Sequence, residues 1–147
     1  MKFTQAGFQK LHQEKETLLT ERVIVLEDVK KSREMGDLSE NGYYKASKSR
    51  LRFIDSQLHR IESILKQATL IEKPLDDRIG LGSLVTLQNG DTTKNYLLVD
   101  VLEANPKEGK ISRKSPLGQK LLGKKKGDIV SVLTPKGTSE WIVERVQ

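Results

Sequence analysis

The stretch at residues 32–44, SREMGDLSENGYY, separates two segments with helical periodicity. Residues 4–31 before it contain no proline and a single glycine, their apolar side chains recur on one helical face, and Thr4 is the expected N-cap. The apolar side chains after it alternate steps of three and four, as in a helix packed along one partner helix: Leu51, Ile54, Leu58, Ile61, Leu65 and Ala68. Because a short connection makes neighbouring helices antiparallel, the sequence predicts a helical hairpin, a coiled coil, with its tip near residues 33–44.

The second half of the chain has the periodicity of β-strands. Asn89-Gly90 is a turn signal between the first two of these strand-like runs, which are residues 84–87, 96–102, 129–133 and 141–146. Residues 115–123, SPLGQKLLG, combine a capping serine, a proline at the first helical position and a glycine stop, so they predict one short helix.

Proline, aspartate and glycine at residues 74–82 mark a linker between the two parts. The chain is therefore expected to be an α+β protein. Its N-terminal helical hairpin would occupy residues 1–73, and a small antiparallel β-sheet domain with one short helix would occupy residues 83–147.

The composition excludes several classes of site. The chain has no cysteine, so disulfides, cysteine nucleophiles and cysteine metal ligands are excluded. Aromatic residues make up 5% of the chain, which argues against a base-stacking platform, while a net charge of +6 suits either a polyanionic partner or plain solubility. No apolar run approaches the roughly 20 residues of a membrane span and the N-terminus lacks a signal-peptide pattern, so a cytoplasmic location without a membrane partner is expected.

Two acidic residues three positions apart, Asp37 and Glu40, lie where the hairpin reverses. One interpretation is structural: Asp37 is the N-cap of the second helix and Glu40 completes a capping box. The other is functional: the two carboxylates hold a hard cation such as Mg²⁺, with the remaining ligands supplied by another molecule because two acids alone bind it poorly. The residues by themselves leave both interpretations open.

Two motifs of the chain resemble those of the Gre transcript-cleavage factors, a bacterial family of transcription elongation factors. The first is residues 33–41, REMGDLSEN, with Tyr44 three positions on, and the second is residues 111–128 around SPLGQKLLG. The motifs stand in the family's order, and the likeness covers nearly the whole chain. The chain departs from the family's commoner pattern at Gly42 and Tyr43, where an alanine and an acidic residue often stand.

The resemblance implies a monomeric regulator of transcription that binds RNA polymerase. It implies that the hairpin enters the polymerase secondary channel and that the C-terminal domain has an immunophilin-like fold. Asp37 and Glu40 would be the catalytic acids, sharing Mg²⁺ with the polymerase only in the complex, with none tightly bound to the free protein. They would stimulate the polymerase's own cleavage of backtracked nascent RNA and rescue arrested complexes, so the chain would be an accessory factor that supplies acids in trans and no enzyme itself.

Basic residues gather near the expected tip on both arms: Lys30, Arg33, Lys45, Lys48 and Arg52. Such a row is usually a solvated helix face. The resemblance implies that these side chains hold the 3′ end of the RNA through phosphate contacts, which is nucleic-acid binding without base recognition.

The short helix of the second domain supplies the candidates for docking to the polymerase: Ser115, Pro116 and Leu117. Leu121 and Leu122, as an apolar pair, are expected in the core instead.

Other functions stay open at this stage. The chain could be a noncleaving paralogue that occupies the channel and regulates or inhibits the polymerase, or a coiled-coil adaptor whose acids are only caps. A prolyl isomerase is disfavoured because the second domain offers only Tyr96 and Trp141 as aromatic residues. His12 and His59 stand alone without a paired acid or nucleophile, so both are expected on the surface.

Overall fold

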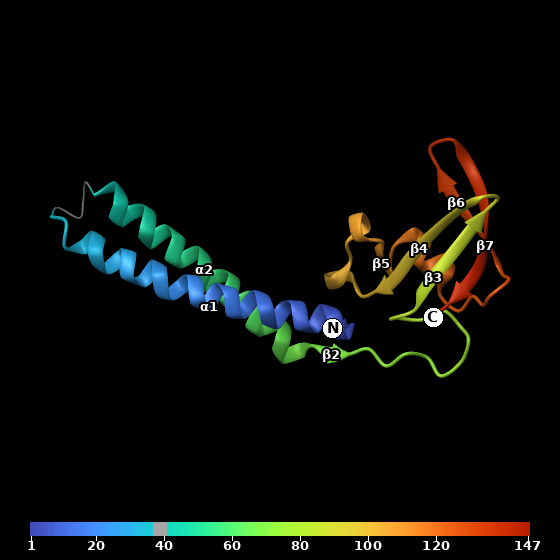
Figure 1. Cartoon of the computed structure of the whole chain (residues 1–147), viewed down its shortest axis with the longest axis horizontal. Coiled ribbons are helices and arrows are strands. Elements are labelled where there is room, and N and C mark those ends of the chain that lie inside the picture. The colour runs from blue at the N-terminus through green and yellow to red at the C-terminus, as the bar shows by residue number, and fades with distance from the viewer. Residues whose placement is uncertain (37–40) are drawn as a thin grey trace. The chain divides into compact units, whose positions relative to one another are not determined.

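Two long helices, α1 (Gln5–Arg33) and α2 (Gly42–Gln67), run in opposite directions and form a hairpin (Figure 1). Thr4 caps α1 as expected, because its Oγ1 accepts a hydrogen bond of 3.0 Å from the Gly7 amide. The predicted helical hairpin is therefore confirmed.

The computed structural model describes residues 1–36 and 41–147. The chain divides into two compact units, which are Phe8–Ala68, called the hairpin unit below, and Met1–Gly7 together with Thr69–Gln147, called the C-terminal unit. The sequence did not indicate that the first seven residues belong with the C-terminal half.

The two arms of the hairpin unit meet along one narrow seam. Its apolar cluster comprises Val25, Ile54 and Leu58, flanked by Leu18 and Leu51. Nearer the tip the seam becomes polar, with the buried hydroxyl oxygens of Ser32 and Ser47 lying 3.3 Å apart. Ion pairs also join the arms: Arg22–Asp55 at 2.6 Å, Lys15–Glu62 at 3.3 Å, Arg60–Glu14 at 3.9 Å and Arg50–Glu21. Because exposed ion pairs each contribute at most about 1 kcal/mol, the apolar seam is the main source of stability.

Asn41 determines where α2 begins. Its Oδ1 accepts a hydrogen bond of 3.0 Å from the Tyr44 amide, and its Nδ2 donates one of 2.8 Å to the carbonyl oxygen of Ser32. One side chain therefore caps α2 and satisfies a carbonyl in the last turns of α1. The interpretation that Asp37 is the N-cap of the second helix was wrong, because α2 starts at Gly42 with Asn41 as its N-cap.

The C-terminal unit is built on a five-stranded sheet of order β5-β4-β3-β7-β6. Its strands are β3 (Leu84–Asn89), β4 (Thr92–Val99), β5 (Lys110–Ser112), β6 (Ile129–Thr134) and β7 (Gly137–Val146). All neighbours are antiparallel except β4 and β5, which are parallel. One short α-helix, α3 (Pro116–Leu121), packs against the sheet, so the expected α+β class is confirmed.

The parallel edge pair was not foreseen. Residues 96–102 were expected to form a single strand, but β4 ends at Val99 and the 3₁₀ helix η1 (Val101–Glu103) follows, with the Asp100 carboxylate accepting from the Val101 amide at 2.9 Å. A second 3₁₀ helix, η2 (Pro106–Glu108), completes the crossover to β5. A parallel neighbour requires such a crossover, and a three-residue strand is too short to show a period of two.

The first residues of the chain are bound into the C-terminal unit. β1 (Lys2–Phe3) pairs in parallel with β2 (Thr69–Leu70), and Phe3 is only 2% exposed. The Glu103 carboxylate accepts hydrogen bonds from both the amide and the hydroxyl of Thr4, with the amide at 2.8 Å. A carboxylate at this position also complements the positive end of the α1 dipole.

Helix α3 packs against the core of the C-terminal unit, and a glycine of this helix lies at the contact. The core side chains are Ile79, Val85, Leu87, Leu98, Ile111, Leu121, Val130, Trp141 and Val143. Gly118 of α3 is buried against the strand before it, and a Cβ atom there would lie 2.0 Å from the backbone oxygen of Ser112.

We predict that Gly118→Ala lowers the free energy of unfolding by about 3 kcal/mol or more, because a backbone atom cannot move aside as a flexible side chain can. Urea unfolding followed by circular dichroism measures the change. Gly42→Ala is the matched control: no atom lies within 4 Å of its Cβ position and its φ is not positive. It should leave stability unchanged or raise it by up to about 1 kcal/mol. Equal stability of Gly118→Ala and the wild type would contradict the close packing of α3.

We also predict that Asn41→Ala destabilises the hairpin unit by about 1 to 2 kcal/mol, because it removes the N-cap of α2 and the hydrogen bond between the arms to the Ser32 carbonyl, which keeps only its bond of 3.2 Å from the Met35 amide. Asn41→Asp should cost less, since aspartate caps helices as well as asparagine does and only the amide donor is lost. Thermal melts of the three proteins at one salt concentration make the comparison. Identical losses in both variants would assign the effect to the arm-to-arm bond alone.

Candidate functional site

The two acids that the sequence singled out, Asp37 and Glu40, lie outside the described residues. Among residues 1–36 and 41–147, no group of three or more histidine, aspartate or glutamate side chains could hold a metal ion. The structure describes the positions on either side of the acids: α1 ends at Arg33 and α2 begins at Gly42. At this end of the hairpin unit Asn41 links the two arms, since it caps α2 and donates to the Ser32 carbonyl of α1.

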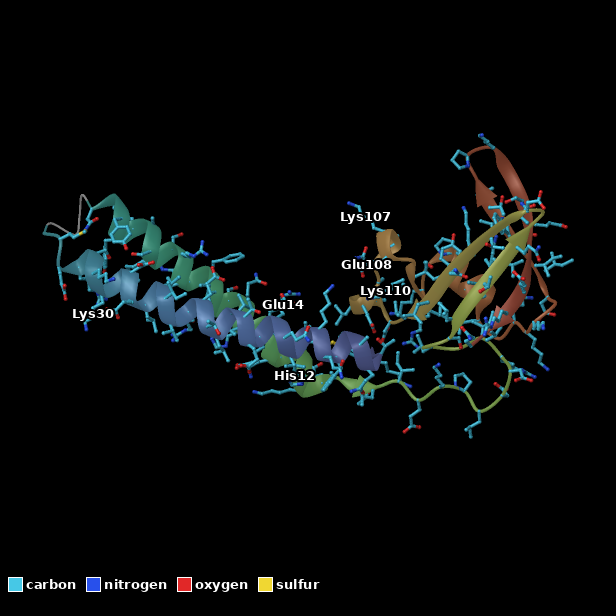
Figure 2. All side chains as sticks on the ribbon, viewed as in Figure 1. His12, Glu14, Lys30, Lys107, Glu108 and Lys110 are labelled. Carbon is cyan, nitrogen blue, oxygen red and sulfur yellow. The ribbon has the colours of Figure 1, made fainter. Side chains whose placement is uncertain are left out.

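The basic residues predicted near the tip are on the described arms. Lys30 and Arg33 lie in the last turn of α1, where the helix dipole favours positive charge (Figure 2 labels Lys30). Lys45, Lys48 and Arg52 follow on α2 at steps of three and four, which places them on one side of that helix. Lys48 is half-buried and the other four are exposed.

The cations of the hairpin unit differ in whether they form an ion pair. Arg22, Arg50 and Arg60 each pair with an acid on the opposite arm. The five basic residues of the tip, defined above, form no ion pair with any acid among the described residues. Their positive charge is therefore not neutralised by the described part of the chain and attracts anions.

Tyr44 brings two of these cations together across the arms. The guanidinium carbon of Arg33 lies 5.9 Å from the centre of the Tyr44 ring, and the Lys48 ammonium lies 5.1 Å from it. Hydrogen bonding by Lys48, then by Arg33, lowers the pKa of the Tyr44 phenol from its ordinary value. This cluster was not predicted from the sequence, although the step of four from Tyr44 to Lys48 on one helix was a usable signal.

Tyr43, the other tyrosine of the first turn, has a different environment. Its hydroxyl donates a hydrogen bond of 3.0 Å to the Asp28 carboxylate on α1. That bond is the main reason why the pKa of the Tyr43 phenol is raised. The unusual Tyr43 of the motif thus adds a further link between the arms.

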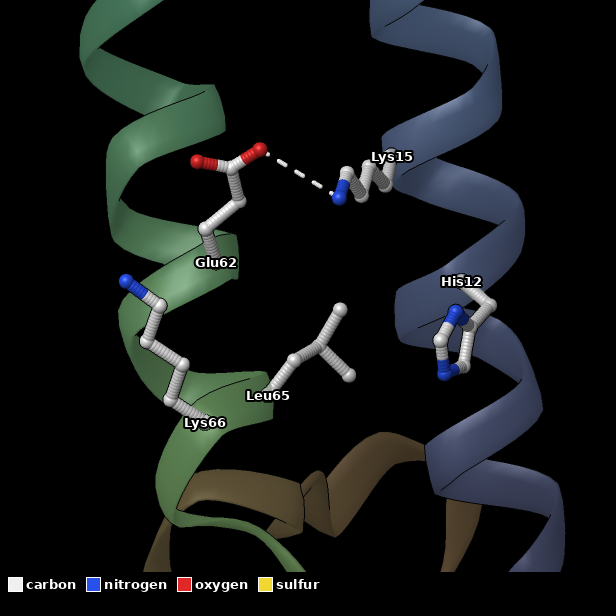
Figure 3. Close-up of a pocket in the computed structure, with 5 residues that line it drawn as sticks. All are labelled: His12, Lys15, Glu62, Leu65 and Lys66. Carbon is white, nitrogen blue, oxygen red and sulfur yellow. Dashed lines mark ion pairs between the residues drawn. The ribbon is translucent and has the colours of Figure 1, made fainter.

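A shallow groove lies between the arms farther along the hairpin unit (Figure 3). It is lined by His12, Lys15, Glu62, Leu65 and Lys66, with the Lys15–Glu62 ion pair at 3.3 Å across it. His12 contacts the Phe8 ring edge-on at 4.8 Å between centroids. Both histidines of the chain are exposed, as expected, and His12 has no acid or nucleophile partner in this groove. In the part of the chain that the structure describes, no helix is long and apolar enough to cross a membrane.

The docking candidates on α3 differ in how much surface they offer. The Ser115 hydroxyl accepts from the Gly118 amide at 3.0 Å and donates to the Ser112 carbonyl at 2.7 Å, so it caps the helix. Pro116 is exposed, whereas Leu117 is half-buried against the core. Their role in docking stays a prediction.

The expected burial of the leucine pair at the end of α3 is half right. Leu121 is fully buried, as expected. The expectation for Leu122 was wrong: it is 41% exposed, because α3 ends at Leu121 and the chain leaves the helical phase there.

Tyr96 and Trp141 lie at one small hollow of the sheet. The hollow is also lined by Leu87, Lys94, Leu117 and Val132. The Lys94 ammonium lies 5.3 Å from the centre of the Trp141 ring, and the indole N–H donates to Ser139 Oγ at 3.0 Å.

Comparison with known proteins agrees with the two motifs. The family model for "Transcription elongation factor, N-terminal" matches residues 1–70, and that for "Transcription elongation factor, GreA/GreB, C-term" matches residues 73–147. The chain is 39% identical over 147 residues to the transcription elongation factor GreA of a Nitratiruptor species, covering 97% of this chain and 90% of that protein. It is 40% identical over 139 residues to GreA of Thermomicrobium roseum, covering 92% and 89%.

A solved structure, the GreA factor homolog 1 of Thermus thermophilus, is 30% identical and covers 100% of this chain and 98% of its own, with a TM-score of 0.47. The two family models together span nearly all of the chain in the order that the sequence motifs indicated. The chain therefore belongs to the GreA/GreB family of transcription elongation factors.

Proposed function

We propose that this chain is an elongation factor that binds RNA polymerase, inserts its hairpin into the secondary channel and stimulates endonucleolytic cleavage of backtracked nascent RNA. It is an accessory factor: the polymerase carries out the cleavage, and the chain supplies acidic residues in trans. The observation that carries the proposal is the capping of α2 by Asn41, which removes the need for Asp37 as a cap. Two acids in a family motif are then available for chemistry at the tip.

The dimensions of the hairpin suit a site deep in another protein. With 29 residues, α1 is about 44 Å long at 1.5 Å per residue. A hairpin of this length buries little apolar surface between its arms. Its length and narrow cross-section would instead allow two side chains at the tip to reach a site deep in a channel. The proposed function therefore explains the length of the hairpin, whereas a role as a coiled-coil adaptor does not.

Asp37 and Glu40 are suited in type to holding Mg²⁺. Carboxylate oxygens are the ligands this ion prefers, and it usually takes one or two of them together with water and phosphate oxygens. Two acids alone hold it weakly, so we propose that the ion is shared with the polymerase in the complex and is not tightly bound to the free protein. Once bound there, Mg²⁺ supplies Lewis-acid stabilisation for phosphodiester hydrolysis.

In this proposal the basic residues of the tip bind the RNA. Lys30, Arg33, Lys45, Lys48 and Arg52 hold phosphates of the displaced 3′ segment, and their freedom from ion pairs with described acids supports that role. The C-terminal unit docks on the polymerase through α3, where Pro116 offers the most accessible candidate surface. The factor acts in the cytoplasm as a monomer.

We predict that Asp37→Asn and Glu40→Gln each lower the cleavage rate of a backtracked complex by about a hundredfold at saturating factor, since losing a metal ligand removes several kcal/mol of transition-state stabilisation. The double variant should lose little more than the worse single variant, because groups that share one ion act as a unit. Gel analysis of the shortened RNA gives the rate.

Glu34→Gln is the matched control, because it removes one negative charge from an exposed residue of the tip that is not proposed as a ligand. It should cleave like the wild type. The two single variants, the double variant and Glu34→Gln should all keep the melting temperature of the wild type and compete equally well for polymerase. Full activity in both single variants would discard the metal role, and a wild-type protein that binds but never cleaves would instead support a noncleaving regulator.

We predict that replacing Lys45, Lys48 and Arg52 together with alanine slows cleavage of long extruded RNA more than of short extruded RNA. The slope of log rate against log salt should flatten by up to about 2, because each phosphate contact on a single strand contributes about 0.7. Replacing Lys10, Lys66 and Lys73, which are also exposed, removes the same charge and should change neither quantity. Equal behaviour of the two triple variants would make the tip cations an ordinary solvated face.

A further inference from the structure

Tyr44 contacts two cations, one from each arm of the hairpin unit. Arg33 is the last residue of α1, and Lys48 lies one turn after Tyr44 on α2. Both cationic groups approach the same ring, at 5.9 Å and 5.1 Å from its centre. No described acid forms an ion pair with either of them.

Tyr44 is itself held in place. Its amide donates to Asn41 Oδ1 at 3.0 Å, so the backbone that carries the ring is fixed by the N-cap of α2. The carbonyl of Tyr44 accepts from the Ser47 hydroxyl at 3.1 Å, and that hydroxyl lies 3.3 Å from Ser32 on α1. The ring is half-buried, which leaves one part against the arms and another open to solvent.

The electrostatics of the cluster indicate what it binds. Two positive groups that share one aromatic ring repel each other, and the negative face of the ring offsets only part of that repulsion. An anion placed between them would be attracted by both. A phosphate also offers several acceptor oxygens, which can receive hydrogen bonds from a guanidinium and an ammonium at once.

We propose that Tyr44 is a positioning residue that holds Arg33 and Lys48 as a single binding site for one phosphate group of the displaced RNA. The ring sets the distance between two long side chains that would otherwise sample many rotamers, so less entropy is lost when the phosphate binds. This inference rests on the proposed function for its ligand, although the cluster itself is independent of cleavage.

The test uses two replacements of the ring in the full-length protein. Tyr44→Phe keeps the aromatic face but loses the hydroxyl that Lys48 and Arg33 approach, so it should slow cleavage of long extruded RNA by no more than about twofold. Tyr44→Leu keeps an apolar side chain but removes the face, and should slow cleavage of long extruded RNA by about five- to tenfold while changing that of short extruded RNA less than twofold. The salt slope should flatten by about 0.7, corresponding to the loss of one phosphate contact.

A double-mutant cycle separates positioning from a general loss of structure. Tyr44→Leu should have no further effect when Arg33 and Lys48 are already alanine, because its action passes through them. A similar loss in that background, or equal losses for Tyr44→Phe and Tyr44→Leu, would overturn the proposal. Melting temperatures identify any variant that fails to fold, in which case the Phe variant and the Arg33→Ala, Lys48→Ala pair still decide the question.

A measurement without polymerase distinguishes failure of this site from failure of the proposed function. Nuclear magnetic resonance of the full-length protein, titrated with a short oligouridylate, should shift the side-chain signals of Arg33 and Lys48 together in the wild type and in Tyr44→Phe. The shifts should be at least several-fold smaller in Tyr44→Leu. Unshifted Arg33 and Lys48 signals in the wild type would overturn the phosphate site, even if the factor stimulates cleavage.

Discussion

The seam between α1 and α2 is the constraint on which the rest of the hairpin depends. A pair of helices buries side chains on only one side of each, so few residues can contribute to stability by leaving water. Here the fully buried apolar cluster is small, Val25 with Ile54 and Leu58, and toward the tip two buried serines replace apolar residues. Near the tip the Asn41 and Tyr43 side chains add two hydrogen bonds between the arms.

The small apolar seam also explains why ion pairs join the two arms. Some cations form ion pairs with acids of the opposite arm and so help to hold the arms together, as Arg22 does with Asp55. The cations Lys30, Arg33, Lys45, Lys48 and Arg52 form no ion pair with a described acid, and Arg33 and Lys48 both contact the Tyr44 ring. Paired and unpaired cations therefore occur on the same two arms.

Much of the fold could be predicted from the sequence because it rests on periodicity. Steps of three and four from Leu51 onward were enough to predict the second arm, and serine, proline and glycine at residues 115–123 were enough to predict α3. The parts that were missed have no period: β5 has three residues, and the turn of η1 depends on the Asp100 carboxylate bonding the next amide. Local capping rules suggested Asp37 as the N-cap of the second helix, whereas Asn41 caps α2 and also donates to Ser32 on the other arm, a contact that local rules do not describe.

The site was predictable in its residue types but not in its arrangement. Sequence motifs singled out Asp37, Glu40 and the five cations, while the contact of Arg33 with Tyr44 depends on how two arms meet and has no local signature. Leu122 was misassigned for a similar reason, since a helix of six residues ends before its periodicity can be trusted.

We propose that the tip acids Asp37 and Glu40 contribute ligands to a Mg²⁺ ion in the polymerase complex. The most direct measurement is the cleavage rate of a backtracked complex as a function of Mg²⁺ concentration, for polymerase alone, with the wild-type factor and with Asp37→Asn. If the acids hold the ion, the wild-type factor lowers the concentration needed for half-maximal cleavage, and Asp37→Asn returns it toward the value for polymerase alone. The same half-maximal concentration for the wild type and the variant would contradict the claim.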